Sequence, residues 1–95
     1  MSEPANSIDA ILAERGSRYG AFIDHATVTQ ALKRIVFDRL RDRGIEMQPD
    51  QYEAIEMIAH KLGRIANGDP DYADSWDDIA GYATLVGDRL RGASK

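Results

Sequence analysis

The fold is decided by residues 49–68, PDQYEAIEMIAHKLGRIANG. Proline is favoured in the first turn of a helix, where its missing N–H loses no hydrogen bond, and an Asn-Gly pair commonly ends a helix. Between these signals, apolar residues recur at spacings of three and four, which predicts a helix with one broad apolar face. This face consists of Tyr52, Ile55, Ile58, Ala59, Leu62, Ile65 and Ala66.

The segments before this helix show the same periodicity. Ser7 is suited to cap a short first helix, which we expect to run to about Arg15 and to end at Gly16. A second and longest helix is predicted from about Ile23 up to Gly44.

A fourth helix follows the turn at residues 69–72, and Asp74 or Ser75 is its expected N-cap. No strand-like alternation survives comparison with these helical patterns. The sequence therefore predicts an all-α bundle of about four helices. The inner stripe of the fourth helix is expected to be Trp76, Ile79, Ala83, Val86 and Leu90.

The length predicts one domain over residues 1–95, with residues 1–6 and 92–95 as flexible tails. The chain is 43% apolar and 29% charged, a balance typical of packed rather than disordered proteins. A domain of this size buries only a modest core, so we expect a homo-oligomer, most simply a dimer, to complete the bundle.

Composition also excludes several classes of function. The net charge is −4, so the chain lacks the basic surface of a nucleic-acid-binding protein. It has no cysteine, which fits a reducing cytoplasm. No signal-peptide pattern and no apolar run of membrane-spanning length is present, so we expect a cytoplasmic protein with no membrane partner.

Acidic residues of the third and fourth helices carry the candidate chemistry. Glu53, Glu56 and His60 fall within about 60° of one another on a helix. Asp74 and Asp78 lie one turn apart on the next helix, which a short turn makes antiparallel to the first. If the four carboxylates meet across the groove, they suit Mg²⁺ or Mn²⁺. Alternatively, they form a solvated acidic edge, with Asp74 as an N-cap.

Two acidic segments carry a resemblance to the MazG-like all-α nucleoside triphosphate pyrophosphatases. Glu53-Ala-Ile-Glu56, a helical spacer and residues 74–78, DSWDD, resemble the ExxE–spacer–ExxD pattern of that superfamily. The third acid here is aspartate rather than glutamate, which shortens its reach. Asp77 fits the literal spacing of the pattern, whereas Asp78 fits the helix geometry better.

A second resemblance covers nearly the whole chain. Residues 14–20, ERGSRYG, residues 56–65, EMIAHKLGRI, and residues 74–83, DSWDDIAGYA, resemble small phage and prophage proteins of unassigned function. This similarity implies family membership without an activity, and it implies the cytoplasm of the host cell as the location.

The MazG-like resemblance implies the activity that we expect. Glu53, Glu56, Asp74 and Asp78 would be the catalytic and metal-binding residues, holding Mg²⁺ or Mn²⁺ that activates a water and binds a nucleoside triphosphate. The products would be a monophosphate and pyrophosphate, by metal-assisted hydrolysis.

Five further residues are candidate phosphate contacts. Arg15, Arg18 and Tyr19 lie in a glycine-bounded segment that we expect to be a loop, and guanidinium groups match phosphate oxygens. We place Lys61 and Arg64 on the flank of the helix opposite His60. From there they could contact only the phosphates of a ligand that a neighbouring helix or subunit also binds. Alternatively, the two loop arginines pair with surface acids, and Lys61 and Arg64 are solvated or form salt bridges to Asp74 and Asp78.

Two other functions remain open from the sequence. A non-catalytic relative would bind a nucleotide or a host protein and act by sequestration or inhibition. A small helical assembly protein would use oligomerisation alone.

Overall fold

The computed structural model describes residues 3–93 and is all-helical over this range, which confirms the predicted fold class. Residues 1–2 and 94–95, the outer parts of the expected tails, lie outside the described residues. The four helices are α1 (Glu3–Tyr19), α2 (Phe22–Asp42), α3 (Pro49–Asn67) and α4 (Ala73–Leu90).

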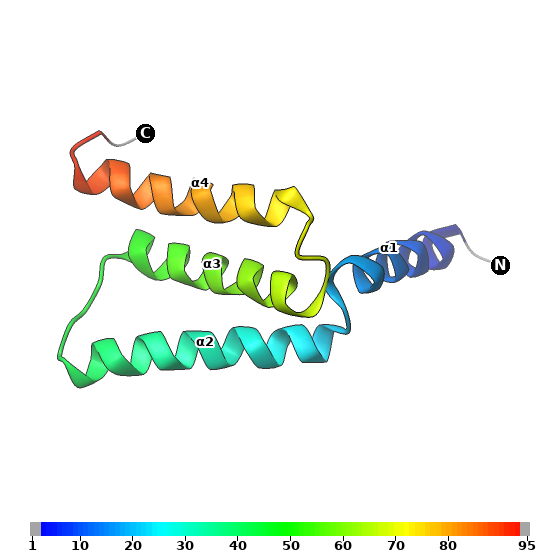
Figure 1. The fold of residues 1–95 in the computed structure, drawn as a ribbon, viewed down its shortest axis with the longest axis horizontal. Helices are drawn as coiled ribbons and strands as arrows, with labels where there is room; N and C mark the ends of the chain where they lie inside the picture. Colours follow the sequence, from blue (N-terminus) through cyan, green and yellow to red (C-terminus); the bar gives the residue numbers. More distant parts are fainter. Residues whose placement is uncertain (1–2, 94–95) are drawn as a thin grey trace.

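Helices α2, α3 and α4 lie side by side with α3 in the middle, and we call this arrangement the three-helix layer (Figure 1). Within residues 3–93, α2 and α4 each pack against α3 but not against each other. Helix α1 projects from the end of the layer where α2 begins and α3 ends (Figure 1). We call this meeting point, where residues 18–20 approach residues 67–69, the α1–α3 junction.

Helix α3 begins and ends as the sequence predicts. Pro49 occupies its first turn, and the side chains of Gln48 and Gln51 each accept a hydrogen bond from the backbone N–H of the other residue, as in a capping box. Helix α2 also ends near the predicted point, because Gly44 adopts a positive φ of 68° that other residues rarely reach.

Helix α1 is longer than predicted at both ends. It begins at Glu3 rather than at Ser7, and it continues through Gly16, because a single glycine costs a helix only about 1 kcal/mol. Gly20 ends it instead, with a φ of 77° and a position against the carbonyl of Asn67 where a Cβ would collide. The expected loop at residues 15–19 is therefore the last turns of a helix.

The N-cap prediction for α4 was also wrong. The helix begins at Ala73 with Tyr72 as its N-cap, and no side chain caps it. Asp74 lies inside the first turn and accepts a 2.8 Å hydrogen bond from the Tyr72 hydroxyl. Ser75 is buried rather than at the helix terminus.

The core of the chain is small. Ala54 and Ala59 are the buried apolar residues among those described, and the expected inner stripe of α4 is largely open, with Trp76 52% and Leu90 62% exposed. The radius of gyration is 16.3 Å, against about 12 Å expected for a compact chain of this length. Other exposed large apolar residues are Ile8, Ile11, Leu12, Phe22, Ile23, Ile35, Val36, Ile45, Leu62 and Leu85.

Candidate functional site

The acidic residues of α3 and α4 are paired with lysines. Lys61 Nζ lies 2.9 Å from Asp78 Oδ2, and the lysine side chain is only 11% exposed. Lys33 of α2 approaches Glu56 at 3.1 Å. Glu53 is exposed on α3. We call the charged contacts of α3 with its two neighbours in the layer the paired seam.

The four predicted metal ligands do not converge in this structure. Glu56 points toward α2 and Asp78 toward α3, while Asp74 accepts a hydrogen bond from Tyr72, two residues earlier in the chain. Among the residues that the structure describes, no three histidine or acidic side chains lie close enough to hold one metal ion. The antiparallel pairing of α3 and α4 is present, but the pairs across it join acids to bases.

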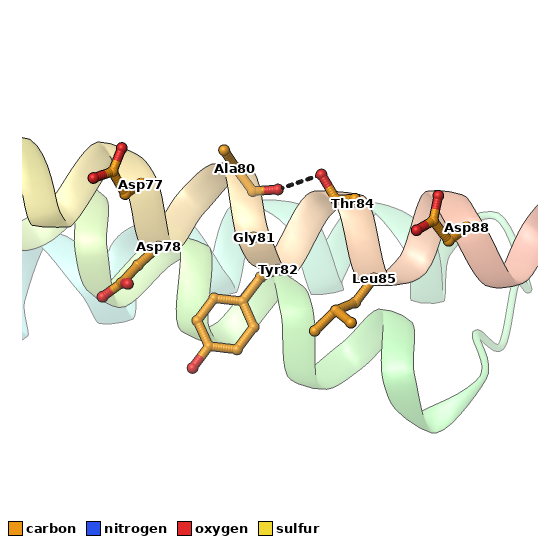
Figure 2. Close-up of a pocket in the computed structure, with 8 residues that line it drawn as sticks. All are labelled: Asp77, Asp78, Ala80, Gly81, Tyr82, Thr84, Leu85 and Asp88. Atoms are coloured by element: carbon orange, nitrogen blue, oxygen red, sulfur yellow. Dashed lines mark hydrogen bonds between the residues drawn. The ribbon is translucent and has the colours of Figure 1, made fainter. Parts of the chain in front are cut away.

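Residues of α4 alone line a shallow hollow of about 530 Å³, which includes Asp77 and Asp78 (Figure 2). Asp78, Tyr82 and Leu85 point to one side of the helix and Asp77 to the other. Because one helix supplies the whole lining, the hollow has no opposite wall to hold a ligand. The two aspartates that compete for the fourth acidic position therefore do not face a common point.

Arginines and tyrosines gather at the α1–α3 junction instead. The guanidinium carbon of Arg64 lies 4.2 Å from the ring centroid of Tyr19, and that of Arg18 lies 4.3 Å from the ring centroid of Tyr72. The two tyrosine rings are 6.4 Å apart and tilted by 58°. We call these four residues, together with Arg15, the Arg–Tyr cluster. Cation–π contacts of this kind hold guanidinium groups in place without neutralising them.

The Arg–Tyr cluster retains unused hydrogen-bonding capacity. Arg64 Nε is buried and has no hydrogen-bond partner among the described residues. An unsatisfied buried donor costs about 1–3 kcal/mol, so a ligand that accepts its hydrogen bond is favoured. Glu14 accepts a 3.2 Å hydrogen bond from Arg18 Nε. It is the one carboxylate among the residues that line the cavities at this cluster.

Two cavities adjoin at this cluster and share Arg15, Tyr19 and Arg64 as a common wall. The smaller, about 320 Å³, has a mostly polar lining, and we call it the polar cavity. The larger, about 610 Å³, has a mostly apolar lining and is the apolar cavity. The polar cavity is completed by Ile11, Glu14, Arg18 and Tyr72, and the apolar cavity by Leu12, Gly16, Gly20, Ala21, Phe22, His25 and His60.

His25 of α2 and His60 of α3 line the apolar cavity where these two helices meet. Their ring centroids are 4.5 Å apart, and His25, which is 4% exposed, donates from Nε2 to the backbone carbonyl of His60 at 2.9 Å. Burial, and then the positive charge of His25, Arg64 and nearby lysines, lowers the pKa of His60 to about 4. The His60 ring is therefore neutral at pH 7.

The structure brings together four of the five predicted phosphate contacts, namely Arg15, Arg18, Tyr19 and Arg64. Lys61 is not among them, because it is buried against Asp78. Our placement of Arg64 on the flank opposite His60 was wrong, since both side chains line the apolar cavity.

Sequence reasoning missed Tyr72, Phe22 and the role of both histidines at this site. These residues come from different elements, and no spacing along the chain connects them. The only available signal was the short 69–72 turn, which returns the chain from α3 to α4 beside the end of α1.

The fold and site define a small all-α domain with a cationic and aromatic cavity at one end. The chain belongs to the family described as Domain of unknown function (DUF6378), whose model matches residues 5–90. No curated protein and no solved structure matches the chain. Family membership thus covers nearly the whole chain, and any activity must be argued from the site.

Within residues 3–93, no helix combines the length and the apolar character needed to cross a bilayer.

Proposed function

We propose that this protein binds a nucleoside triphosphate at the α1–α3 junction. The observation that carries the proposal is the convergence of Arg15, Arg18 and Arg64 around one cavity, although they lie on two separate helices. Planar guanidinium groups match phosphate oxygens in pairs, and tyrosine rings hold two of them in position.

The charge of the site supports an anionic ligand. The chain as a whole carries a net charge of −4, yet the polar cavity is lined by three arginines and a single carboxylate, Glu14. A local excess of positive charge in an acidic protein is most simply explained by an anion that it binds.

Hydrolysis of the bound triphosphate to a monophosphate and pyrophosphate is a second candidate function. It rests on the MazG-like resemblance of Glu53, Glu56, Asp74 and Asp78, of which Glu56 and Asp78 each hold the ammonium group of a lysine in this single chain. The four acids named by the MazG-like resemblance do not fit a metal site in this single chain, so we derive no step through Mg²⁺ or Mn²⁺. Such an activity would alter the nucleotide pool of a phage-infected cell.

We further propose that the protein is a homodimer. Its accessible surface is 6,688 Å², which exceeds by about 1,300 Å² the area expected for a compact monomer of 10.5 kDa. A stable interface buries about 800 Å² on each partner, so the excess is sufficient for one. Leu62, 38% exposed on α3, is one of the exposed apolar side chains that a second copy would cover.

The proposal is tested by titrating nucleoside triphosphates into the protein with isothermal calorimetry, with and without Mg²⁺ or Mn²⁺. We expect saturable binding that Arg64→Gln weakens at least about tenfold, because a charge-assisted contact is worth roughly 1.5–3 kcal/mol. Arg34→Gln is the matched control, since Arg34 is exposed on α2 and lines neither cavity.

Pyrophosphate release is followed in the same samples. Release that is lost in Glu56→Ala would support hydrolysis, and binding without release would support the non-catalytic form. An absence of binding would overturn the proposal and would favour a protein partner instead.

A further inference from the structure

The apolar cavity lies directly beside the polar cavity. Arg15, Tyr19 and Arg64 form part of the lining of both, so a ligand held by these arginines has a second chamber within reach. That chamber measures about 610 Å³, within the range of 300–1,000 Å³ typical of small-molecule sites. The pair of cavities therefore suits a ligand with one strongly anionic end and one flat, largely apolar end.

The position of Phe22 points to an aromatic occupant. This phenylalanine is 76% exposed although it lines a cavity, and its ring meets the His25 ring edge-on at 5.8 Å. An exposed aromatic ring at a cavity offers a flat apolar surface to a planar ligand. Stacking of a base on such a ring is worth about 1–3 kcal/mol.

The polar groups of the apolar cavity suit the edge of a neutral ring. His25 Nε2 is already engaged with the backbone carbonyl of His60, whereas the neutral His60 ring has one donor and one acceptor nitrogen. An aromatic base carries both kinds of group on its edge, so the uncharged imidazole can pair with it without repelling it.

We propose that the apolar cavity binds the base of a nucleoside triphosphate, with Phe22 against its face and His60 at its edge, while Arg15 and Arg64 contact the phosphates. This inference rests on the proposed function and adds the class of ligand to it. The protein selects nucleosides over inorganic polyphosphate because only a nucleoside fills both cavities.

The experiment compares inorganic tripolyphosphate with a panel of purine and pyrimidine nucleoside triphosphates by calorimetry on the full chain. We expect the best nucleotide to bind at least about tenfold more tightly than tripolyphosphate, in line with one stacked base. Phe22→Ala should remove this difference and leave the affinity for tripolyphosphate unchanged. Ile23→Ala is the matched control, because Ile23 is 72% exposed next to Phe22 and does not line the cavity.

A second measurement follows the ring protons of His60 by NMR, which should shift with the nucleotide but not with tripolyphosphate. If tripolyphosphate binds and no nucleotide binds more tightly, or if Phe22→Ala keeps the difference, the base-binding inference is overturned and phosphate binding stands. If neither ligand binds, both proposals fail.

Discussion

Charged residues of α3 have opposite surroundings in the paired seam and in the Arg–Tyr cluster. In the paired seam, opposite charges meet directly, as in Lys61–Asp78 and the bidentate contact of Arg89 with Asp50. In the Arg–Tyr cluster, Arg64 lies over a tyrosine ring, and its Nε has no partner among the described residues.

Charges in the paired seam stabilise the fold, whereas the arginine charges in the Arg–Tyr cluster are available to a ligand. An ion pair satisfies both partners, so it has little left to offer a substrate. A guanidinium stacked on a tyrosine keeps its full charge and its in-plane donors. Glu56 and Asp78 are engaged in ion pairs in this chain, so the arginines of the Arg–Tyr cluster are the better candidates for contacting a ligand.

The largest expected effect comes from Gly68→Ala, which disrupts the α1–α3 junction and no other contact between helices. A Cβ at Gly68 would collide with the backbone carbonyl of Arg18, so α1 must move away from the layer. We expect a loss of about 1–3 kcal/mol in the free energy of unfolding and loss of nucleotide binding, measured by denaturant titration and calorimetry.

The matched control for this variant is Gly81→Ala on α4. Nothing lies within 4 Å of the added Cβ there, and alanine is the better helix former, so stability should rise by about 1 kcal/mol. Equal effects of the two substitutions would contradict the close approach of Gly68 to the backbone of Arg18.

Arg64→Lys tests whether planarity matters in addition to charge. Lysine keeps the positive charge but has no planar group to stack on Tyr19 or to pair with two phosphate oxygens. We expect nucleotide affinity to fall by about tenfold in calorimetry, corresponding to roughly 1.4 kcal/mol. Full retention of affinity would mean that the site is only a diffuse positive field.

The pH dependence of stability tests the environment of His60. Its pKa of about 4 in the folded chain lies below the ordinary value of 6.5, so the unfolded chain binds more protons between these pH values. Stability should therefore fall as the pH is lowered from 6.5 to 4, by about 1 kcal/mol for a partly solvated ring.

Thermal melts of the wild type and of His60→Asn across this range give the measurement. The variant should lose this part of the pH dependence. A wild-type curve that is flat between pH 6.5 and 5 would contradict the burial of the His60 ring.

The smallest effect is expected in the paired seam, from Asp50→Asn. The contact with Arg89 lowers the pKa of Asp50, so its contribution is present above the ordinary carboxyl pKa and is lost as the pH falls through the lowered value. We expect a slightly lower melting temperature at pH 7, a smaller difference in high salt, and unchanged nucleotide binding. A change in binding would remove the distinction between seam and cluster.

Much of the secondary structure could be predicted because it depends on local signals. Pro49 and the Asn67-Gly68 pair bound α3 in the structure as they do in the sequence, and Gly44 ends α2. Gly16 misled the prediction because a glycine alone does not show which of two nearby glycines must adopt a positive φ. The contact of Gly20 with Asn67 settles that choice, and it joins residues far apart in the chain.

The sequence by itself determined the all-α class, the antiparallel order of α3 and α4, and the candidate status of Arg15, Arg18, Tyr19 and Arg64. Only the tertiary structure decided that the acids would be paired with lysines and that these four residues would share a cavity with Tyr72. The physical reason is that helical periodicity sets which side chains share a face. The packing of one helix against another determines which charges meet.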